Sequence, residues 1–209
     1  MINKKRLEMD LQKIPPHPNP KVEYEQYSTP ATLASDLLWN AYTFGDIENK
    51  NILDLGCGTG IFVIGSLKLG ATSAIGIDID AESIKVANDY CNDLNIKKFN
   101  FITSDIEDIT PNFEINTIFQ NPPFGSQKKA KKGADLKFIN KACEFNPEVI
   151  YSFHMASTQE FLIDYFNQKG FEVTHILHYE FKIPKLYDFH NKESKKVKVM
   201  VVRAKNNKI

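Results

Sequence analysis

The apolar positions of this chain fall into short continuous runs separated by longer amphipathic segments, a pattern that predicts alternating strands and helices. The helical spacing of Leu33, Leu37 and Leu38 predicts a first helix over residues 32–42. The strands predicted after it cover residues 51–55, 73–79, 99–103, 115–120 and 149–153. The helices predicted among these strands cover residues 60–69, 81–94, 137–144 and 158–169.

The end of the chain has a different pattern. Two long β-rich runs, residues 171–183 and 197–203, are separated by a polar loop, which predicts an antiparallel pair. Strands that alternate with helices indicate a parallel sheet covered by helices on both faces. The predicted fold class is therefore α/β, with a mostly parallel seven-stranded sheet and an antiparallel last strand. Ligands of such sheets bind beyond the carboxyl ends of the strands, just after residues 55, 78, 103 and 120.

Composition narrows the class of protein. The chain has 209 residues, of which 42% are hydrophobic and 25% charged, and this suits one globular domain rather than a disordered chain. No apolar run approaches the roughly 18 residues that cross a bilayer, and no secretory leader is visible. The three cysteines lie far apart, so we expect neither a zinc site nor a disulfide framework. These features predict a soluble, cytoplasmic protein with no metal.

The neutral net charge conceals an uneven distribution. Residues 182–209 hold nine Lys and Arg against two acidic residues, whereas residues 76–116 hold nine acidic residues and three Lys. The segment 128–137 adds five Lys and one Asp. Two basic segments around an acidic centre suit a polyanion on one face and a cationic ligand on the other. The alternative interpretation is an ordinary solvated surface.

A glycine-rich loop follows the first predicted strand and opens the next helix. It reads DLGCGTG over residues 54–60, so Gly56 and Gly58 let a ligand approach the backbone closely. A dinucleotide loop reads GxGxxG, but this loop reads GxGxG and begins with Asp54. That carboxylate would repel a pyrophosphate and suits a cationic sulfonium with its ammonium group. The loop therefore favours S-adenosylmethionine as the cofactor.

Acidic residues follow the next two predicted strands. Asp78 lies at the end of the second strand, where a carboxylate can accept hydrogen bonds from ribose hydroxyls. Asp105 follows the third strand and could accept from an adenine amine, while Ile106 offers its backbone. Asp80 directly precedes a predicted helix, and we interpret it as a helix cap.

The turn after the fourth strand carries the most specific pattern, Asn121-Pro122-Pro123-Phe124. An exocyclic amine is a poor nucleophile because its lone pair is delocalised into the ring. The Asn121 side-chain oxygen and the Pro122 carbonyl can each accept one N–H and draw the lone pair out of conjugation. The prolines stiffen the turn, and Phe124 offers a face for a base taken out of its stack. The simpler interpretation is a turn that ends a strand.

The N-terminal segment is polar and rich in proline. We divide the chain into an arm with a cofactor lid, residues 1–31, and a main domain, residues 32–209. The lid would be formed by Gln26, Tyr27 and Thr29, which lie just upstream of the first predicted helix.

With these residues the chain resembles class I, Rossmann-like S-adenosylmethionine-dependent methyltransferases of the NPPF type. More narrowly, it resembles the archaeal and eukaryotic methyltransferase-like protein five family. The resemblance rests on EQY at 25–27, DIENK at 46–50, DLGCGTG at 54–60, GIDID at 76–80, NPPFG at 121–125, SFH at 152–154, and Ile183, Pro184, Tyr187, Phe189 and His190.

The resemblance implies N6-methylation of one adenosine in small-subunit ribosomal RNA. It also implies a small zinc-binding activator subunit, of the tRNA-methyltransferase-activator type, as a heterodimer partner. Catalysis carries over to Asn121, Pro122, Pro123 and Phe124. Cofactor contacts carry over to Gln26, Thr29, Gly56, Thr59, Ile61, Asp78, Asp105 and Ile106.

The residues also favour RNA independently. A DNA methylase that reads a sequence needs a recognition module, whereas structured RNA can present an unstacked base through phosphate contacts. Candidate phosphate contacts include Lys128, Lys129, His190 and Lys192. Three alternatives remain open: N5-methylation of glutamine in a release-factor-type protein, methylation of another exocyclic base amine, or a degenerate methylase that acts as a scaffold.

Overall fold

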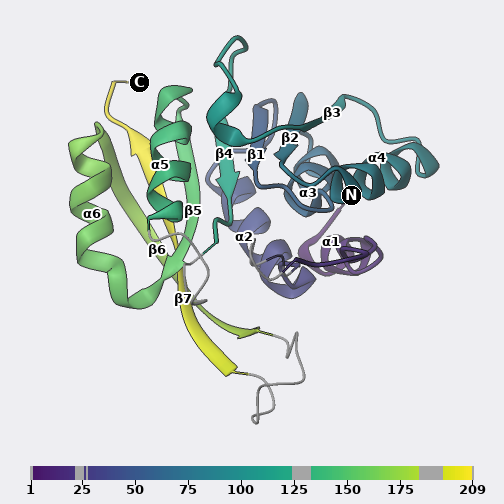
Figure 1. Ribbon diagram of the computed structural model, residues 1–209, viewed down its shortest axis with the longest axis horizontal. Helices are drawn as coiled ribbons and strands as arrows, with labels where there is room; N and C mark the ends of the chain where they lie inside the picture. The colour runs from purple at the N-terminus through teal and green to yellow at the C-terminus, as the bar shows by residue number, and fades with distance from the viewer. Residues whose placement is uncertain (1, 22–25, 27, 124–132, 184–194, 209) are drawn as a thin grey trace.

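The computed structural model describes residues 2–21, 26, 28–123, 133–183 and 195–208 (Figure 1). Its strands form one seven-stranded sheet with the order β3-β2-β1-β4-β5-β7-β6. The strands are β1 (Asn51–Leu55), β2 (Ser73–Asp78), β3 (Phe99–Thr103), β4 (Thr117–Gln120), β5 (Val149–Met155), β6 (Phe171–Ile183) and β7 (Lys195–Asn206).

The pairing of these strands confirms the predicted fold class. Strands β1 to β5 pair in parallel, and β7 runs antiparallel to both of its neighbours, β5 and β6. Parallel strands need crossover connections, and an α-helix supplies each of them except the one from β3 to β4, which holds only a 3-10 turn. The helices are α1 (Lys4–Leu11), α2 (Ala31–Thr43), α3 (Ile61–Lys68), α4 (Ala81–Asp93), α5 (Ala134–Glu144) and α6 (Gln159–Gln168), with short 3-10 turns η2 (Ile106–Asp108) and η3 (Ala156–Thr158).

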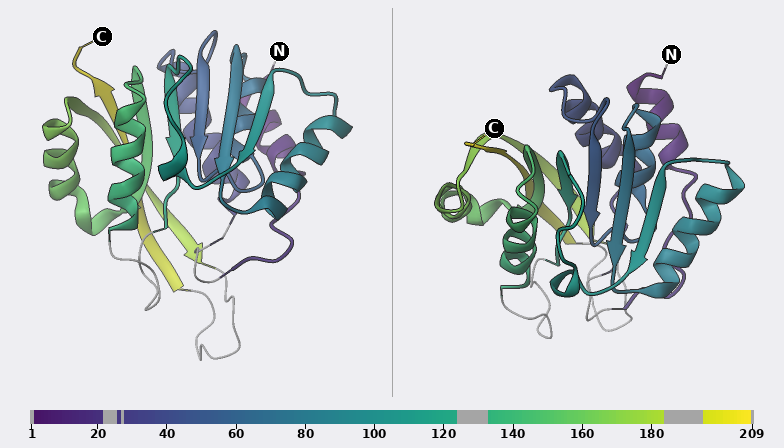
Figure 2. Two further views of the ribbon diagram at one scale, coloured as in Figure 1. Left: turned by 45° about the horizontal axis from the view of Figure 1, so that its top comes forward. Right: turned by 90° about the horizontal axis from the view of Figure 1, so that it is seen from above.

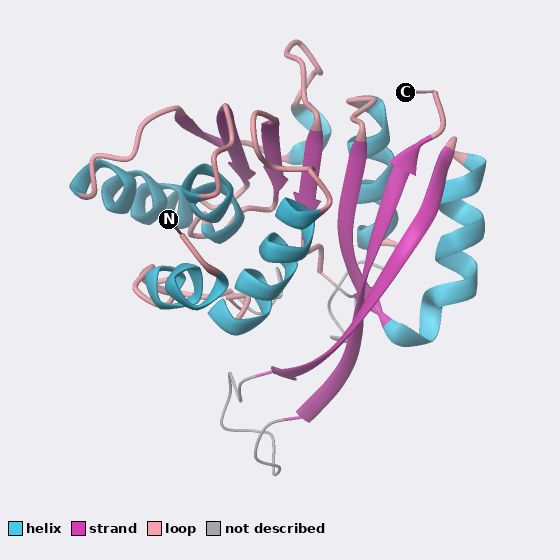
Figure 3. Ribbon diagram, turned by 180° about the vertical axis from the view of Figure 1, so that it is seen from behind, coloured by secondary structure: helices cyan, strands magenta, loops and turns pink. Residues whose placement is uncertain are grey.

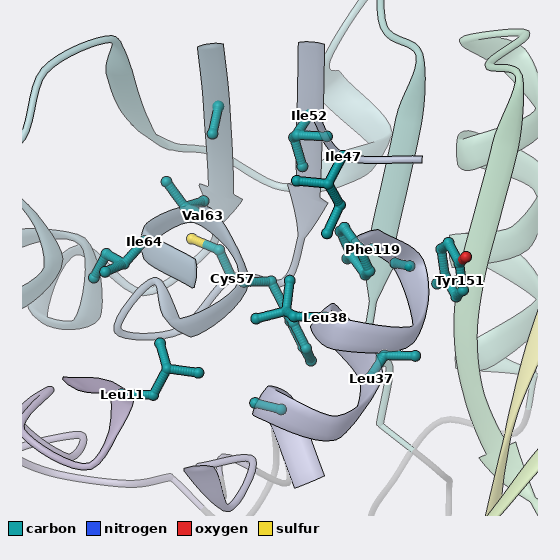
Figure 4. Close-up of a cluster of buried hydrophobic side chains, with 14 of the residues drawn as sticks. Leu11, Leu37, Leu38, Ile47, Ile52, Cys57, Val63, Ile64, Phe119 and Tyr151 are labelled. Atoms are coloured by element: carbon teal, nitrogen blue, oxygen red, sulfur yellow. The ribbon is translucent and has the colours of Figure 1, made fainter. Parts of the chain in front are cut away.

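The helices lie in two layers on opposite faces of the sheet, as Figures 2 and 3 show. Side chains from α1 to α4 form one apolar cluster with the sheet, which includes Leu11, Leu38, Val63 and Phe119 (Figure 4). Side chains from α5 and α6 form a second cluster on the other face. Both faces of the central strands are therefore covered, which explains why side chains on both faces of β1 and β4 are buried, the polar Asp54 and Gln120 among them.

Some element boundaries differ from those predicted. Helix α5 begins at Ala134 rather than at residue 137, because Gly133 precedes it in the left-handed conformation, at φ 79°. Strand β7 begins at Lys195 and ends at Asn206, because it pairs with β6 along its whole length. The ends of β7 are polar in sequence, so the apolar pattern does not predict them as strand, whereas their pairing with β6 makes them so.

The β6–β7 hairpin extends beyond the rest of the sheet. Strand β5 ends at Met155, which pairs with Val199, whereas β6 and β7 remain paired as far as Ile183 and Lys195. The extension lies on the side of the carboxyl ends of the parallel strands and is visible at the bottom of Figure 1. Among the described residues, none of the helices combines the length and apolar character needed to cross a bilayer.

Candidate functional site

A pocket of about 510 Å³ opens at the carboxyl ends of β1, β2, β3 and β4, where the topology predicts a ligand. The first turn of α3 and the segment before α2 also contribute to its wall. Of the residues expected to bind cofactor or substrate, those that line it are Gln26, Thr29, Gly56, Gly58, Thr59, Ile61, Asp78, Asp105, Ile106, Asn121 and Pro123. The structure therefore brings most of the described candidates to one place.

The glycine loop leaves space on the pocket side and packs tightly on the other. A Cβ at Gly58, where φ is 52°, would meet nothing within 4 Å. A Cβ at Gly60 would lie 2.7 Å from the Phe101 ring. The backbone N–H of Gly58 donates to Asp78 Oδ2 over 2.7 Å, which fixes the loop against the end of β2. The loop therefore offers bare backbone to a ligand.

Asp54 lies at the end of β1 with 1% of its surface exposed, and neither carboxylate oxygen has a hydrogen-bond partner among the described residues. Burial raises the pKa of Asp54 well above its ordinary value, and the charge of Asp78 adds to this. A buried carboxyl without a partner is costly unless a donor or cation is present. This orphaned carboxyl and the open glycine loop fit a cofactor that carries positive charge. Asp54 itself lies outside the pocket lining.

Two further carboxylates stand on the pocket wall. Asp78 accepts from the N–H groups of Gly58 and Asp80, yet burial still raises its pKa. Asp105 accepts from the Glu107 N–H over 3.0 Å and so caps the η2 turn. Both oxygens of Asp78 already accept one N–H each and keep a further lone pair, whereas Asp105 accepts from Glu107 through Oδ1. Both carboxylates can therefore also accept from hydroxyl or amine donors of a ligand.

The end of β4 carries the candidate catalytic turn. Asn121 Nδ2 donates to Thr29 Oγ1 over 3.1 Å, and Asn121 Oδ1 is buried without a partner among the described residues. Pro123 lines the pocket and Pro122 is buried beside it. The turn therefore holds one unused acceptor beside the pocket, and an amine with two N–H groups is the complementary donor.

Sequence analysis missed a cluster around Asp80. Asp80 caps α4, as expected, through a 2.9 Å bond from the Glu82 N–H to Oδ1. Its other oxygen, Oδ2, lies 3.0 Å from Gln26 Nε2, 2.9 Å from Lys21 Nζ and 3.5 Å from His17 Nε2. Burial alone would raise the pKa of Asp80, but the hydrogen bonds from Gln26, Lys21 and the Glu82 N–H, together with the charge of Lys21, outweigh it and hold the pKa well below its usual range.

The Asp80 cluster fastens the N-terminal arm beside the pocket. Ile14, Pro15, Pro16 and His17 of the arm all line it. The proline-rich composition was visible in the sequence, but nothing in the pattern placed the arm against Asp80. The remaining candidates, Tyr27, Phe124, Lys128, Lys129, His190 and Lys192, lie outside the described residues.

Comparison with known proteins places this geometry in context. Residues 32–146 match the family model of the methyltransferase small domain. An uncharacterized protein of Methanocaldococcus jannaschii is 42% identical over 97% of this chain and 94% of its own length. The rRNA N(6)-adenosine-methyltransferase METTL5 of Danio rerio is 30% identical over 95% of this chain and 97% of its own length.

A solved structure is similar over nearly the whole chain. It is a Pyrococcus horikoshii protein that carries a provisional description as an RNA methyltransferase. The TM-score is 0.87 and the sequence identity 38%, and the match covers 99% of this chain and 98% of that one. The arm, the sheet and the long hairpin are therefore all within the shared structure.

Proposed function

This chain belongs to the methyltransferase small-domain family and to the family of METTL5, and from that premise we propose that it methylates N6 of one adenosine in small-subunit ribosomal RNA. The observation that carries the proposal is the oxygen Oδ1 of Asn121, which is buried beside the pocket without a hydrogen-bond partner in the described part of the chain. Adenosine presents at N6 an amine with two N–H donors, which this oxygen would bind.

The methyl donor is S-adenosylmethionine, which supplies an electrophilic methyl group on a sulfonium when it is bound. The backbone of Gly56 and Gly58 would hold its methionine part, with Asp54 as the nearby negative charge. Asp78 would accept from the ribose hydroxyls. Asp105 and the backbone of Ile106 would bind the adenine, and Thr59 and Ile61 would complete the wall.

The residues of the turn then prepare the substrate amine. Asn121 Oδ1 accepts one N–H of the amine, and the Pro122 carbonyl accepts the other. These two bonds hold the nitrogen lone pair out of the ring and leave it available for methyl transfer. Thr29 keeps the Asn121 amide in one orientation. The rigid Pro122-Pro123 backbone limits the entropy lost when the amine binds. Phe124 is assigned the stacking of the flipped base.

RNA binding is assigned to the two basic segments. The β6–β7 hairpin runs past the edge of the sheet that carries the pocket, and its register places Lys182 opposite Lys196. Residues 182–209 carry a net charge of +7 by sequence, which suits phosphate groups. Lys128, Lys129, His190 and Lys192 belong to these segments and complete the proposed contact surface.

We also assign the protein a zinc-binding activator subunit and a cytoplasmic location. Strand β3 is the edge strand of the sheet on the side away from the hairpin. Its Phe99 and Ile102 side chains are half-buried and Asn100 is exposed. An edge strand has a free row of backbone groups that a partner strand can pair with.

The proposal also includes the N-terminal arm, residues 1–31, as a lid over the cofactor.

One assay tests the reaction and the substrate together. Labelled S-adenosylmethionine is incubated with naked small-subunit rRNA, with and without the activator subunit, and the nucleosides are identified by mass spectrometry. We expect N6-methyladenosine from the wild type and none from Asn121→Ala. The Asn121→Ala variant should bind the cofactor with wild-type affinity in calorimetry, whereas Asp78→Ala should bind it more weakly.

Other products would redirect the assignment. A methylated guanosine or cytidine would keep the enzyme class and change the base. No transfer to RNA, but transfer to a glutamine amide of a release-factor-type protein, would overturn the RNA substrate. Cofactor binding without transfer to any acceptor would indicate a scaffold.

A further inference from the structure

Two buried polar side chains and one partly exposed carboxylate form an array next to the end of β4. Ser152 and His154 lie on β5, and Ser152 Oγ is 2.6 Å from His154 Nε2. Asp135, in the first turn of α5, lies on the other side of the ring, with Oδ2 3.7 Å from His154 Nδ1. Ser152 and His154 are 0% and 1% exposed. An arrangement of Ser, His and Asp in this order is familiar from hydrolases.

A nucleophilic role for this array conflicts with its burial. Ser152 sits in the middle of the sheet, paired with Gln120 of β4 on one side and Val202 of β7 on the other. Neither Ser152 nor His154 lines the described pocket. A substrate carbonyl therefore has no route to the hydroxyl, and the array must act on the protein itself.

The array continues to the residue that precedes the catalytic asparagine. Gln120 Nε2 donates to Ser152 Oγ over 2.9 Å. The Ser152 hydroxyl can then donate to His154 Nε2. Nδ1 has no hydrogen-bond partner among the described residues and faces the Asp135 carboxylate at 3.7 Å, an ion-pair distance rather than a hydrogen bond. With Ser152 as the donor, a neutral ring carries its proton on Nδ1, on the side of that carboxylate. Burial lowers the pKa of His154 and so keeps the ring neutral.

The positions of the two ends of the array indicate what it acts on. Gln120 is the last residue of β4, immediately before Asn121, and Asp135 lies in the first turn of α5. Along the chain, Gln120 lies just before the catalytic turn and Asp135 lies after the lysines that follow the turn, and the array links these two residues. Resting on the function proposed above, we propose that Asp135, His154, Ser152 and Gln120 form a positioning relay that holds Asn121 in the orientation needed for methyl transfer.

The first test is kinetic. Ser152→Ala and Asp135→Ala interrupt the relay at two places, while Asp135→Asn keeps an oxygen that accepts from Nδ1. At saturating cofactor and RNA, we expect both alanine variants to lower the single-turnover rate about 10-fold to 100-fold, as small misplacements of reacting groups do. Asp135→Asn should recover most of the rate. Cofactor affinity, measured by calorimetry, should stay at the wild-type value in all three.

A control and a double variant separate positioning from general damage. Glu144→Ala removes a carboxylate from the last turn of the same helix, where it pairs with Lys141, and should leave the rate unchanged. Ser152→Ala combined with Asp135→Ala should lose no more than the slower single variant, because both interrupt one relay. Additive losses, or alanine variants as fast as Glu144→Ala, would overturn the relay.

A second readout does not depend on activity. In the protein without cofactor, nitrogen NMR of the His154 ring should show the proton on Nδ1. The side-chain amide signals of Gln120 and Asn121 should shift in Ser152→Ala and Asp135→Ala but not in Glu144→Ala. Unshifted Asn121 signals would refute the relay even if the wild type failed to methylate RNA, an outcome that would count against the proposed function alone.

Discussion

Asn121 and Thr29 are joined by a 3.1 Å hydrogen bond in which the asparagine amide nitrogen donates to the threonine hydroxyl. The bond connects the end of β4 with the segment that enters α2, although the two residues are 92 positions apart in the chain. It occupies the donor end of the amide. The oxygen is left as the only part of that side chain that can accept from a substrate amine, so Thr29 decides how Asn121 faces the pocket.

Replacing Thr29 by valine should therefore slow methyl transfer. Thr29→Val removes the hydroxyl with little change in volume, and the Asn121 amide can then rotate and present its nitrogen. We expect the single-turnover rate at saturating cofactor to fall about tenfold, the loss that corresponds to roughly 1.4 kcal/mol. Thr29→Ser keeps the acceptor and serves as the control. A Thr29→Val enzyme as fast as Thr29→Ser would show that the bond does not orient the amide.

Asp54 should make the cofactor-free protein less stable as the pH rises. Because burial raises its pKa in the folded state, the folded protein holds this proton more tightly than the unfolded chain, whose value is about 3.9. Above that value the unfolded state gains from ionisation, and stability declines until the folded pKa is passed. Asp54→Asn cannot ionise, so its thermal midpoint should exceed that of the wild type at neutral pH.

Thermal melts over a pH series check this prediction. The difference between Asp54→Asn and the wild type should grow from acidic to neutral pH, and the variant should bind cofactor more weakly because it lacks the negative charge. Asp93→Asn, at an exposed position near the end of α4, is the matched control and should follow the wild type. Parallel pH curves for all three proteins would contradict the assignment.

The Asp80 cluster should govern how fast the cofactor leaves. Asp80→Asn keeps the cap of α4 but removes the charge that attracts Lys21, so the arm beside the pocket should open more often. We expect cofactor dissociation, followed by stopped flow, to be about three to ten times faster, as for the loss of one or two hydrogen bonds. Lys13→Ala, which removes the ion pair between Lys13 and Asp10 near the start of the arm, is the control.

The same cluster gives a pH dependence with the opposite sign to that of Asp54. The pKa of Asp80 is held below its usual range, so its contribution to stability is complete above about pH 3.9 and is lost only as the pH falls further. The arm should therefore stay closed throughout the neutral range. Dissociation in the wild type that accelerated between pH 8 and pH 6 would rule out this description.

The sequence predicts the sheet and the location of the site well because both follow from local patterns. The bounds of β1, β3 and β6 agree with the predicted runs, and the residues at the strand ends meet at one edge because parallel topology requires it. The family resemblance is confirmed by the relatives. The roles of individual site residues stay predictions.

Contacts between distant segments could not be predicted in this way. Gln26 and Asp80 are 54 positions apart. The spacing of Leu7 and Leu11 suits a helix at the start of the arm, but nothing in the sequence between that helix and Gln26 indicates that this segment packs against Asp80. Nothing in the sequence likewise relates Asp135 to His154, and the two residues meet only because the fold places α5 against β5. Polar contacts of this kind depend on the geometry of the whole sheet, which a linear pattern does not contain.

A buried ion pair at the amino ends of the parallel strands, the end of the sheet opposite the pocket, should contribute to stability but not to catalysis. There Arg203 of β7 binds Asp46 through two hydrogen bonds, of 2.8 Å from Nε to Oδ2 and 3.0 Å from Nη2 to Oδ1. Tyr151 donates to the same carboxylate. Both members of the pair are nearly buried, so Arg203→Met leaves Asp46 without its cation, and we expect a loss of about 3 to 5 kcal/mol in unfolding free energy by denaturant titration.

Arg203→Met should nevertheless transfer methyl groups at the wild-type rate per folded molecule at low temperature, because the pair lies at the amino end of β1, away from the pocket. Lys205→Met, on the same strand but exposed, should change neither quantity. Because the loss comes from the Asp46 charge left buried without its cation, the double variant Arg203→Met with Asp46→Asn should recover part of the lost stability. If the double variant lost as much stability as the two single variants together, Arg203 and Asp46 would not be coupled. The stability of this end of the sheet would then have to come from packing around β7.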